Sequence, residues 1–570
     1  MDYKENYDLW INSSFIDESM KNELKNITEE DKKDRFYKDL EFGTGGLRGI
    51  IGAGSNRINI YTVAKATEGF SRYLKSKYKD NISVAIAYDS RNMSFQFAEI
   101  AANLLVNNNI KVFLFDKLTP TPILSYAVRY LKCNGGIVIT ASHNPKEYNG
   151  YKVYDDRGVQ VTDDIAKEIL ININSIKDFD EINLNITNEQ LKKKNLRYIG
   201  EEIYSTYLEK VKELSLRKEL VIKNSEKLNI IYTPLHGTGN LPIRKLLSDL
   251  NYKNLFIVKD QENPDINFST VDYPNPEDPK VFDLALKMAK ERDIDIILGT
   301  DPDCDRIGVM VKNCNGDFNI LTGNQVGVLL SYYILDTLKE KNKMPNNGMI
   351  LKTIVTTDMI KEFKKDFNFN IFEVLTGFKY IGEFIEKEKD KKFILGFEES
   401  YGYLAGDFVR DKDAVIATML ICEMALYYKL KGLTLQDVLK NLYNKYGYFK
   451  EELITFELKG QSGKDKIDKI INNFRENSRE IFKEFKLETI EDYKIGKINS
   501  LIIEKERDIN LPKSNVIKFI FKDNSWVVIR PSGTEPKIKI YISVKGKSQK
   551  ECDTILEKLK SLIALQINSI

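Results

Sequence analysis

The chain has 570 residues, of which 42% are hydrophobic and 30% are charged, the composition of an ordinary folded protein. Because a single hydrophobic core rarely grows beyond about 250–300 residues, this length predicts several domains. Lysine and arginine total 86 against 84 aspartate and glutamate, so the net charge is only +2. Such a balance excludes a strong field for steering nucleic acid or an anionic membrane, and we expect neither as a partner.

The cellular location is suggested by what the sequence lacks. Residues 1–10 are charged rather than apolar, unlike a signal peptide, and no apolar run approaches the ~18 residues that span a bilayer. Five scattered cysteines without a CxxC pair argue against a disulfide framework or a zinc site. These cysteines are Cys133, Cys304, Cys314, Cys422 and Cys552. We expect a cytoplasmic protein, and nothing in the sequence specifies its oligomeric state.

A repeated order of elements begins at residue 82. Residues 82–88 and 110–115 are rich in β-branched and apolar residues and predict strands, separated by a helical pattern from Phe97 to Leu105. A helix follows from about Pro122 to Lys132, and a strand at 136–140 then runs directly into a polar segment. This first unit therefore alternates strands with helices and ends in a polar loop.

The same order returns twice. The second unit has predicted strands at 229–232, 255–258 and 294–298, with helices at 241–250 and 279–291. The third has predicted strands at 349–355, 370–375 and 393–397, with helices at 358–366 and 379–388. Alternating strands and helices predict mostly parallel sheets, whose ligands lie beyond the carboxyl ends of the strands. Each polar loop falls at such an end.

The remaining segments complete the predicted architecture. Residues 170–200 are interpreted as peripheral decoration and a connection, and the proline-rich residues 263–279 as an extended loop. An amphipathic pattern at 467–482 and strands at 526–529 and 538–544 indicate a last, smaller α+β domain. The fold class is α/β: three similar mixed α/β domains plus this C-terminal domain, around a central cleft. The expected domains are 1–210, 211–323, 324–446 and 447–570.

Ser142 is the first candidate for chemistry. It follows a buried strand in Thr140-Ala-Ser-His-Asn-Pro and precedes His143, one of only two histidines, so it resembles a nucleophile beside its base. An ordinary turn that caps a strand explains the same residues, and on this segment alone the turn is favoured. His236, in Pro-Leu-His-Gly, is interpreted as a satisfied loop histidine.

Asp301-Pro-Asp-Cys-Asp-Arg is a sharper signal. Its carboxylates, on Asp301, Asp303 and Asp305, alternate and would repel one another unless a divalent cation gathers them. Oxygen ligands indicate a hard metal, Mg²⁺ or Ca²⁺. An EF-hand is excluded, because Arg306 and Lys312 occupy the positions that require glycine and glutamate. A site for a hard divalent cation is therefore expected, with Cys304 a small filler rather than a ligand.

Three further loops carry weaker signals. Glu398-Glu-Ser follows an apolar strand and offers carboxylates for sugar hydroxyls, although a plain turn is at least as good an interpretation. Arg530-Pro-Ser-Gly-Thr offers a guanidinium fork, hydroxyls and approachable backbone N–H groups for a phosphate, and Lys539 adds a positive charge. Gly43-Thr-Gly-Gly-Leu-Arg-Gly holds Arg48 but is not a Walker A loop.

Together these loops resemble those of the α-D-phosphohexomutase superfamily, over nearly the whole chain and in family order. The phosphoserine, metal, sugar and phosphate loops are similar to Thr140-Ala-Ser-His-Asn-Pro, Asp301-Pro-Asp-Cys-Asp-Arg, Gly396-Phe-Glu-Glu-Ser and Arg530-Pro-Ser-Gly-Thr. Glu41-Phe-Gly-Thr-Gly-Gly-Leu-Arg-Gly, Asn149-Gly-Tyr-Lys-Val-Tyr, Thr376-Gly-Phe-Lys and Thr534-Glu-Pro-Lys-Ile-Lys are most similar to the phosphoglucomutase/phosphopentomutase branch.

The resemblance implies a role for each matching residue. Ser142 would carry the phosphate, and one of its oxygens would join Asp301, Asp303 and Asp305 on Mg²⁺. The candidates for proton transfer and charge stabilisation are His143, Lys152 and Arg48. The substrate-side positions are Arg306, Thr376, Gly377, Glu398, Ser400 and Lys412. The non-reacting phosphate would be held by Arg530, Ser532, Gly533, Thr534 and Lys539. Many members carry arginine where this chain has Lys539, which disfavours bidentate binding there.

The implied enzyme is an intramolecular phosphotransferase that interconverts sugar 1-phosphate and 6-phosphate, glucose phosphates foremost, through a bisphosphate of the glucose 1,6-bisphosphate type. A phosphopentomutase acting on ribose or deoxyribose 1-phosphate is the alternative. A phosphatase or mutase with Asp301 as nucleophile would make Ser142 dispensable. A regulator that only binds phosphosugars would keep the Arg530 loop without turnover.

Overall fold

The computed structural model describes residues 2–43, 45–183, 189–313, 315–458, 461–531 and 537–569, with residues 461, 462 and 464 described by backbone only. Within these ranges no helix is both long and apolar enough to cross a bilayer. The chain forms two compact units. The first comprises Met1–Val326, Asn347–Met349 and Phe378–Leu435, and the second comprises Gly327–Asn346, Ile350–Gly377 and Gln436–Ile570.

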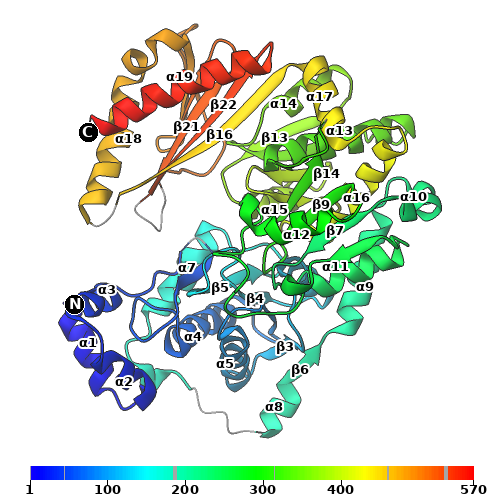
Figure 1. Ribbon diagram of the computed structural model, residues 1–570. Helices are drawn as coiled ribbons and strands as arrows, with labels where there is room; N and C mark the ends of the chain where they lie inside the picture. The colour runs from blue at the N-terminus through cyan, green and yellow to red at the C-terminus, as the bar shows by residue number, and fades with distance from the viewer. Residues whose placement is uncertain are drawn as a thin grey trace. The chain divides into compact units, whose positions relative to one another are not determined.

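The first sheet belongs to the first unit and has the strand order β1-β5-β4-β2-β3-β6 (Figure 1). Its strands are β1 (Gly46–Ile50), β2 (Ser83–Tyr88), β3 (Lys111–Phe115), β4 (Gly135–Ile139), β5 (Tyr148–Asp155) and β6 (Leu196–Ile199). Strands β4, β2, β3 and β6 are parallel to one another, and β5 runs antiparallel to both of its neighbours, β4 and β1. All six residues of β2 are buried, as expected for a central strand covered on both faces.

Helices connect these strands. They are α4 (Ile60–Lys77), α5 (Ser94–Asn107), α6 (Thr121–Tyr130) and α7 (Asp163–Asn174). The apolar faces of α4, α5 and α7 share one core with the strands, in which Phe70, Phe97 and Ile169 are buried. The interpretation of residues 170–200 as decoration is wrong at its end, because β6 pairs in parallel with β3 as an edge strand. α8 (Glu189–Asn195) precedes it.

Three short helices open the chain: α1 (Tyr3–Asn12), α2 (Glu18–Lys25) and α3 (Glu29–Phe36). Each begins at a polar N-cap residue and ends within 8 to 10 residues. Helices this short are marginally stable alone, so tertiary contacts must stabilise them. Trp10 and Phe36 provide these contacts by packing with Tyr61 of α4. None of these three helices was predicted from the sequence.

The second sheet has the order β11-β10-β9-β7-β8. Its strands are β7 (Ile230–Thr233), β8 (Leu255–Ile257), β9 (Ile296–Thr300), β10 (Ile307–Lys312) and β11 (Phe318–Leu321). Its flanking helices include α9 (Glu201–Glu213), α10 (Lys218–Asn224), α11 (Asn240–Asp249) and α12 (Asp283–Ala289). Residues 263–278 contain neither helix nor strand, so the extended loop predicted from their prolines is confirmed.

The third sheet has the order β13-β12-β14-β15. Its strands are β12 (Gly348–Thr353), β13 (Asn370–Val374), β14 (Lys392–Glu398) and β15 (Gly402–Leu404). The helices of this part are α13 (Gly323–Glu340), α14 (Met359–Glu362), α15 (Phe378–Lys387), α16 (Ala414–Lys429) and α17 (Leu435–Tyr446). α16 buries every residue from Ala414 to Tyr428, which explains why its sequence is apolar on all sides.

The C-terminal sheet is larger than the two strands that the sequence predicted. Its order is β16-β22-β21-β20-β17-β18-β19, and every described pairing is antiparallel. The strands are β16 (Tyr448–Glu457), β17 (Leu487–Asp492), β18 (Lys497–Ser500), β19 (Lys505–Asp508), β20 (Ile517–Phe521), β21 (Trp526–Pro531) and β22 (Lys537–Gly546). α18 (Gln461–Ile481) and α19 (Gln549–Asn568) pack against it in one core (Figure 1). The mixed α/β sheets and the C-terminal domain confirm the predicted fold class.

Candidate active site

Ser142 lies in the loop that leaves the carboxyl end of β4. Its backbone is left-handed, with φ of 52°, a conformation that non-glycine residues rarely adopt outside constrained loops. The backbone N–H of Ser142 donates to Oγ1 of Thr140 at 2.8 Å, which fixes this turn. Oγ of Ser142 then donates to Oδ2 of Asp301 at 2.7 Å and lies 3.2 Å from Nδ1 of His143. The structure therefore brings the predicted serine to the predicted acidic loop.

Arg91 binds the backbone of this loop, and it was not among the residues predicted from the sequence. Its Nη2 donates to the carbonyl oxygens of Ser142 and Asn144 at 2.6 and 2.5 Å, and its Nη1 donates to those of Pro145 and Tyr148 at 2.8 and 3.1 Å. Burial lowers the pKa of Arg91, although nearby Asp89 opposes this shift. The signal was present in the sequence, because Asp89-Ser-Arg follows β2 as the other polar loops follow their strands.

The three aspartates of the loop between β9 and β10 form the acidic cluster. Asp301, Asp303 and Asp305 are fully buried, and each has a ligand atom within 4.8 Å of those of the others. Oδ1 of Asp301 accepts from the backbone N–H groups of Asp305 and Arg306, which closes the loop. Among the described residues, the Oδ1 atoms of Asp303 and Asp305 are buried without a hydrogen-bond partner. Such orphaned carboxylate oxygens fit a hard cation such as Mg²⁺.

The electrostatics of the cluster point the same way. Burial raises the pKa of Asp301 well above its usual value, and the charges of Asp303 and Asp305 raise it further. Burial would also raise the pKa of Asp303, but Lys152, a hydrogen bond with Asp301 and the charge of Lys412 together outweigh burial, and the net shift is downward. Without a cation, the cluster therefore favours a proton on Asp301, and a divalent cation would relieve the same repulsion.

Two lysines reach the cluster from separate segments. Nζ of Lys152, on β5, lies 2.7 Å from Oδ2 of Asp303 and 3.3 Å from Oδ2 of Asp305. Nζ of Lys412 lies 2.8 Å from the same Asp305 oxygen. Burial would lower the pKa of each lysine, but the aspartates outweigh it and raise both. Both lysines therefore stay protonated at neutral pH, beside the hydroxyl of Ser142.

The segment around Lys412 is held by buried tyrosines on both sides. Tyr154 donates to Asp411 at 2.6 Å, and Tyr207 donates to both carboxylate oxygens of Asp413 at 2.9 and 2.7 Å. Asp413 also caps α16, accepting from the N–H groups of Val415 and Ile416. Burial raises the pKa of Asp413 to about 7 despite these hydrogen bonds. Neither tyrosine was singled out from the sequence.

His143 and Arg48 flank the serine. Burial lowers the pKa of His143 well below its usual value, and the positive charges of Arg306 and Arg48 lower it further, so the imidazole is neutral at pH 7. Arg48 is exposed, and its Nη1 lies 3.3 Å from Oδ1 of Asn144 as donor. The glycine-rich segment that carries Arg48 allows its backbone to lie close to that of β5. A Cβ on Gly46, where φ is +149°, would lie only 1.9 Å from the carbonyl oxygen of Tyr151.

Glu398 ends β14 in the first unit. Burial raises its pKa to about 7, and the charges of Lys412 and Arg306 oppose this shift. Nη1 of Arg306 donates to Glu277 at 2.7 Å, and its Nε lies 3.9 Å from Asp305. Ser400 lies half-buried in the turn that follows. Glu398 and Arg306 thus place both signs of charge next to the acidic cluster.

The remaining predicted residues belong to the second unit. Arg530 on β21 lies directly opposite Lys539 on β22 in the antiparallel register. Opposed side chains project from the same face of a sheet, so two positive charges are placed side by side. Thr376 is half-buried, and Gly377 has φ of +119°. Ser532, Gly533 and Thr534 lie outside the described residues.

A buried serine hydroxyl, an acidic triad and two protonated lysines define the class of the protein: an enzyme of phosphoryl transfer. Family models support this class over most of the chain. They describe phosphoglucomutase/phosphomannomutase alpha/beta/alpha domains I, II and III, at residues 39–180, 205–316 and 322–446, and the C-terminal domain at 479–560. The chain belongs to the phosphoglucomutase/phosphomannomutase family, within the α-D-phosphohexomutase superfamily, and is a sugar-phosphate mutase.

Individual proteins are similar to this chain over nearly its whole length. A phosphoglucomutase of Staphylococcus epidermidis is 39% identical over 557 residues, covering 97% of this chain and 99% of the relative. The crystal structure of the Paramecium phosphoglucomutase parafusin, in an open form, matches with a TM-score of 0.70 at 19% identity over 93% of this chain and 96% of that one. An Aspergillus fumigatus N-acetylphosphoglucosamine mutase, in complex with GlcNAc-6P and magnesium, matches with a TM-score of 0.50 at 14% identity over 93% and 95% of the two chains.

Proposed function

We propose that this enzyme interconverts glucose 1-phosphate and glucose 6-phosphate through a phosphorylated Ser142 and a glucose 1,6-bisphosphate intermediate. The observation that carries the proposal is the 2.7 Å hydrogen bond from Oγ of Ser142 to Asp301, within a triad that leaves two buried carboxylate oxygens without partners. Glucose is preferred as the substrate because the relatives that match nearly the full chain are named phosphoglucomutase. The expected domains 1–210, 211–323, 324–446 and 447–570 would supply the phosphoserine, the metal ligands, the sugar contacts and the phosphate contacts.

The reaction takes two balanced steps. A hydroxyl of the sugar phosphate attacks the phosphorus of phosphorylated Ser142, the bond from phosphorus to Oγ breaks, and the proton of the sugar hydroxyl passes to Oγ. The bisphosphate then reorients, and Oγ of Ser142 attacks the other phosphate and loses its proton to the sugar oxygen. The enzyme regains its phosphoserine, and the phosphate has changed position on the sugar.

The triad is the proposed holder of the metal. Mg²⁺ bound by Asp301, Asp303 and Asp305 would withdraw charge from the transferring phosphoryl group. Lys152 and Lys412, both protonated and in contact with the triad, would stabilise the same negative charge. Arg48 adds an exposed guanidinium at the edge of the serine loop.

His143 is the proposed proton carrier for Ser142. Its Nδ1 lies 3.2 Å from Oγ, and its lowered pKa keeps the ring neutral, so it can accept a proton when Oγ attacks. Lys152 is less suited to act as a base, because Asp303 and Asp305 hold it protonated. It remains suited to charge stabilisation.

The remaining residues are proposed to bind the substrate. Glu398 and Ser400 would accept and donate hydrogen bonds to sugar hydroxyls, with Arg306, Thr376 and Gly377 as further substrate-side positions. Arg530 and Lys539 would bind the phosphate that does not react, together with Ser532, Gly533 and Thr534. Two cationic residues opposed in register on one sheet face support this role, because both can reach a single phosphate group.

The test compares Ser142→Ala with Ser175→Ala, an exposed serine of the same unit. The intact wild-type protein should carry the mass of one phosphoryl group after incubation with glucose 1,6-bisphosphate, and Ser142→Ala should not. Turnover of glucose 1-phosphate should disappear in Ser142→Ala and in wild type treated with EDTA, and persist in Ser175→Ala. Full activity of Ser142→Ala would favour Asp301 as nucleophile, and no activity in the wild type would favour a binding protein.

Substrate preference needs its own measurement. The kcat/KM values for glucose 1-phosphate, mannose 1-phosphate, ribose 1-phosphate and deoxyribose 1-phosphate should be compared on the same preparation. A higher value for glucose 1-phosphate supports the proposal. A higher value for either pentose phosphate would instead identify a phosphopentomutase, with the chemistry of Ser142 unchanged.

A further inference from the structure

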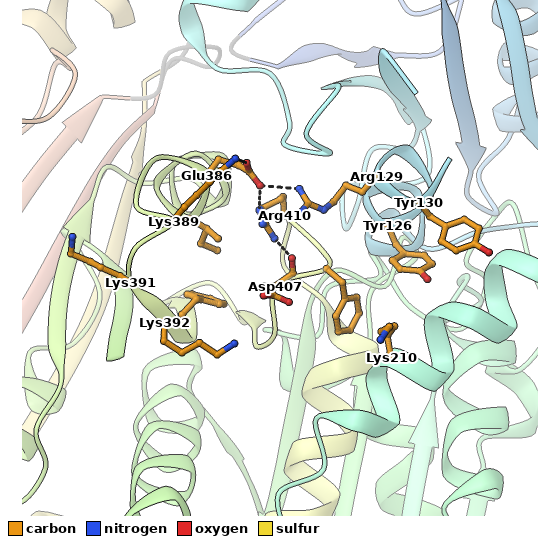
Figure 2. Close-up of a pocket in the computed structure, with 13 residues that line it drawn as sticks. Tyr126, Arg129, Tyr130, Lys210, Glu386, Lys389, Lys391, Lys392, Asp407 and Arg410 are labelled. Atoms are coloured by element: carbon orange, nitrogen blue, oxygen red, sulfur yellow. Dashed lines mark hydrogen bonds and ion pairs between the residues drawn. The ribbon is translucent and has the colours of Figure 1, made fainter. Parts of the chain in front are cut away.

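A groove with a volume of about 730 Å³ lies in the first unit, away from the residues of the proposed reaction (Figure 2). Tyr126 and Tyr130 of α6 line one side, and residues from α15, β14 and the segment 407–410 line the other. Its cationic lining residues are Arg129, Lys210, Lys389, Lys391, Lys392 and Arg410. No residue assigned to the serine loop or the acidic triad takes part in this lining.

Positive charge in the groove exceeds the negative charge available to balance it. Six cationic side chains face two carboxylates, Glu386 and Asp407, in a chain whose whole net charge is only +2. Glu386 is shared: it lies 2.7 Å from Nε of Arg410, 2.9 Å from Nη1 of Arg129 and 3.4 Å from Nζ of Lys389. Figure 2 shows this carboxylate between the two guanidinium groups. One half-buried carboxylate therefore compensates three cations.

The other lysines differ in how they are balanced. Lys391 pairs with Glu388 and Lys210 pairs with Glu213, carboxylates outside the groove lining. Lys392 is exposed, and among the described residues it has no ion-pair partner. Three cations of the lining therefore share Glu386, and Lys392 adds a further positive charge, so several phosphoryl oxygens could each find a cation.

Aromatic side chains form the wall beside these cations. Tyr126 and Tyr130 are stacked, with ring centroids 5.6 Å apart and an interplanar angle of 26°. Phe408 meets Tyr126 edge-on at 5.9 Å. Tyr130 is 42% exposed, so part of this flat apolar surface remains accessible. Cationic side chains next to an accessible aromatic surface suit an organic molecule that carries several phosphoryl groups.

The groove shares one short segment with the reaction centre. Arg410 enters the groove, and two residues later Lys412 reaches Asp305 at 2.8 Å. The backbone N–H of Arg410 donates to Oγ of Ser125 at 2.9 Å, and Tyr154 holds Asp411 from the opposite side. A ligand that draws Arg410 away from Glu386 must strain this segment and so disturb the position of Lys412.

We propose that this groove is a regulatory site for a small anion carrying two or more phosphoryl groups. The source of the anion is either a nucleoside polyphosphate, which would also stack on the tyrosines, or an inorganic polyphosphate. Binding of this anion does not depend on which sugar phosphate is the substrate, because no residue of the groove is proposed to contact the substrate.

Binding is tested by calorimetric titration of the full chain with tripolyphosphate and with ATP, in EDTA to remove divalent cations. The titrations use an Arg530→Gln background, because Arg530 of the proposed phosphate site could itself bind the anion and hide binding at the groove. In that background, Lys389→Ala/Lys392→Ala should weaken binding at least tenfold. The exposed control pair Lys167→Ala/Lys253→Ala, which removes the same charge elsewhere, should change it less than twofold. Equal weakening in both pairs, or no binding to the parent protein at millimolar anion, overturns the proposal.

The second measurement addresses regulation and the source of the anion. With free Mg²⁺ held constant, the bound anion should change the mutase kcat/KM of the protein with native Arg530 at least twofold, and the groove double variant should not respond. Binding without this change would overturn the regulatory role. Tighter binding of ATP than of tripolyphosphate would identify a nucleotide as the ligand. Equal binding would show that the phosphoryl groups alone are recognised. Either result agrees with a site for an anion that carries several phosphoryl groups.

Discussion

Nη2 of Arg91 donates a 2.6 Å hydrogen bond to the carbonyl oxygen of Ser142, so a buried guanidinium sets the backbone of the residue that is proposed to carry the phosphate. The same side chain reaches three further carbonyl oxygens of this loop, and it lies with Nε 3.4 Å from Oδ2 of Asp89. A planar fork can serve several carbonyls at once, whereas an ammonium group is a single point charge. Arg91 is therefore a positioning residue for the serine loop.

Arg91→Lys keeps the charge but loses the fork. We expect kcat to fall about 10- to 100-fold because the serine hydroxyl is displaced from the attacking geometry, while KM changes less than threefold. The control is Arg72→Lys, a partly exposed arginine of the same sheet region. An unchanged kcat with an intact thermal transition would show that the loop keeps its conformation without the guanidinium.

We expect Mg²⁺ to stabilise the folded protein, because only the folded loop brings the orphaned oxygens of the triad together, so a cation bound there would favour the folded state. At 100 times its dissociation constant, the gain is about 2.7 kcal/mol, enough to raise Tm by a few degrees. Asp303→Asn should remove most of this shift, and Asp164→Asn, with a side chain that is 94% exposed, should keep it. Thermal melts with Mg²⁺ or EDTA measure both. An equal rise of Tm in Asp303→Asn would place the cation elsewhere.

Asp413 predicts a pH dependence of stability. Its folded pKa of about 7 lies above its ordinary value of 3.8, so the folded state favours the protonated form. A raised pKa gives stability that is present at acid pH and is lost as the pH rises through the folded value. Between pH 5 and pH 8 the loss from this group is roughly 3 kcal/mol.

Asp413→Asn should remove this loss, since an amide oxygen still caps α16 and the amide carries no charge. Urea unfolding at pH 5 and pH 8 gives the free energy of unfolding of each protein. Relative to wild type, the variant should gain stability on going from pH 5 to pH 8, while Asp164→Asn should track the wild type. Parallel curves for wild type and Asp413→Asn would mean that the carboxylate is already ionised at pH 5.

The sequence predicted the strands that carry the site better than it predicted their partners. β2, β4 and β9 are short, continuously apolar runs that end in polar residues, a local pattern, and the serine and aspartate loops follow directly. β6 and β17 to β19 are mostly half-buried or exposed, and only pairing with distant segments identifies them as strands. The contacts of Arg91, Tyr154 and Tyr207 could not be predicted for the same reason, because their hydrogen-bond partners lie 51 to 257 residues away in the chain.

The opposition of Arg530 and Lys539 gives the last prediction. A guanidinium binds a phosphate through two parallel hydrogen bonds, and an ammonium does not, so the present pair provides one fork and one point charge. Lys539→Arg should add a second fork and lower KM for glucose 1-phosphate about threefold, and Arg530→Lys should raise it about tenfold. In both variants kcat should change little, because the bound phosphate is the one that does not react. Lys522→Arg, an exposed substitution in the same domain, is the control. A loss of kcat without a change in KM in Arg530→Lys would instead place this arginine at the transferring phosphate.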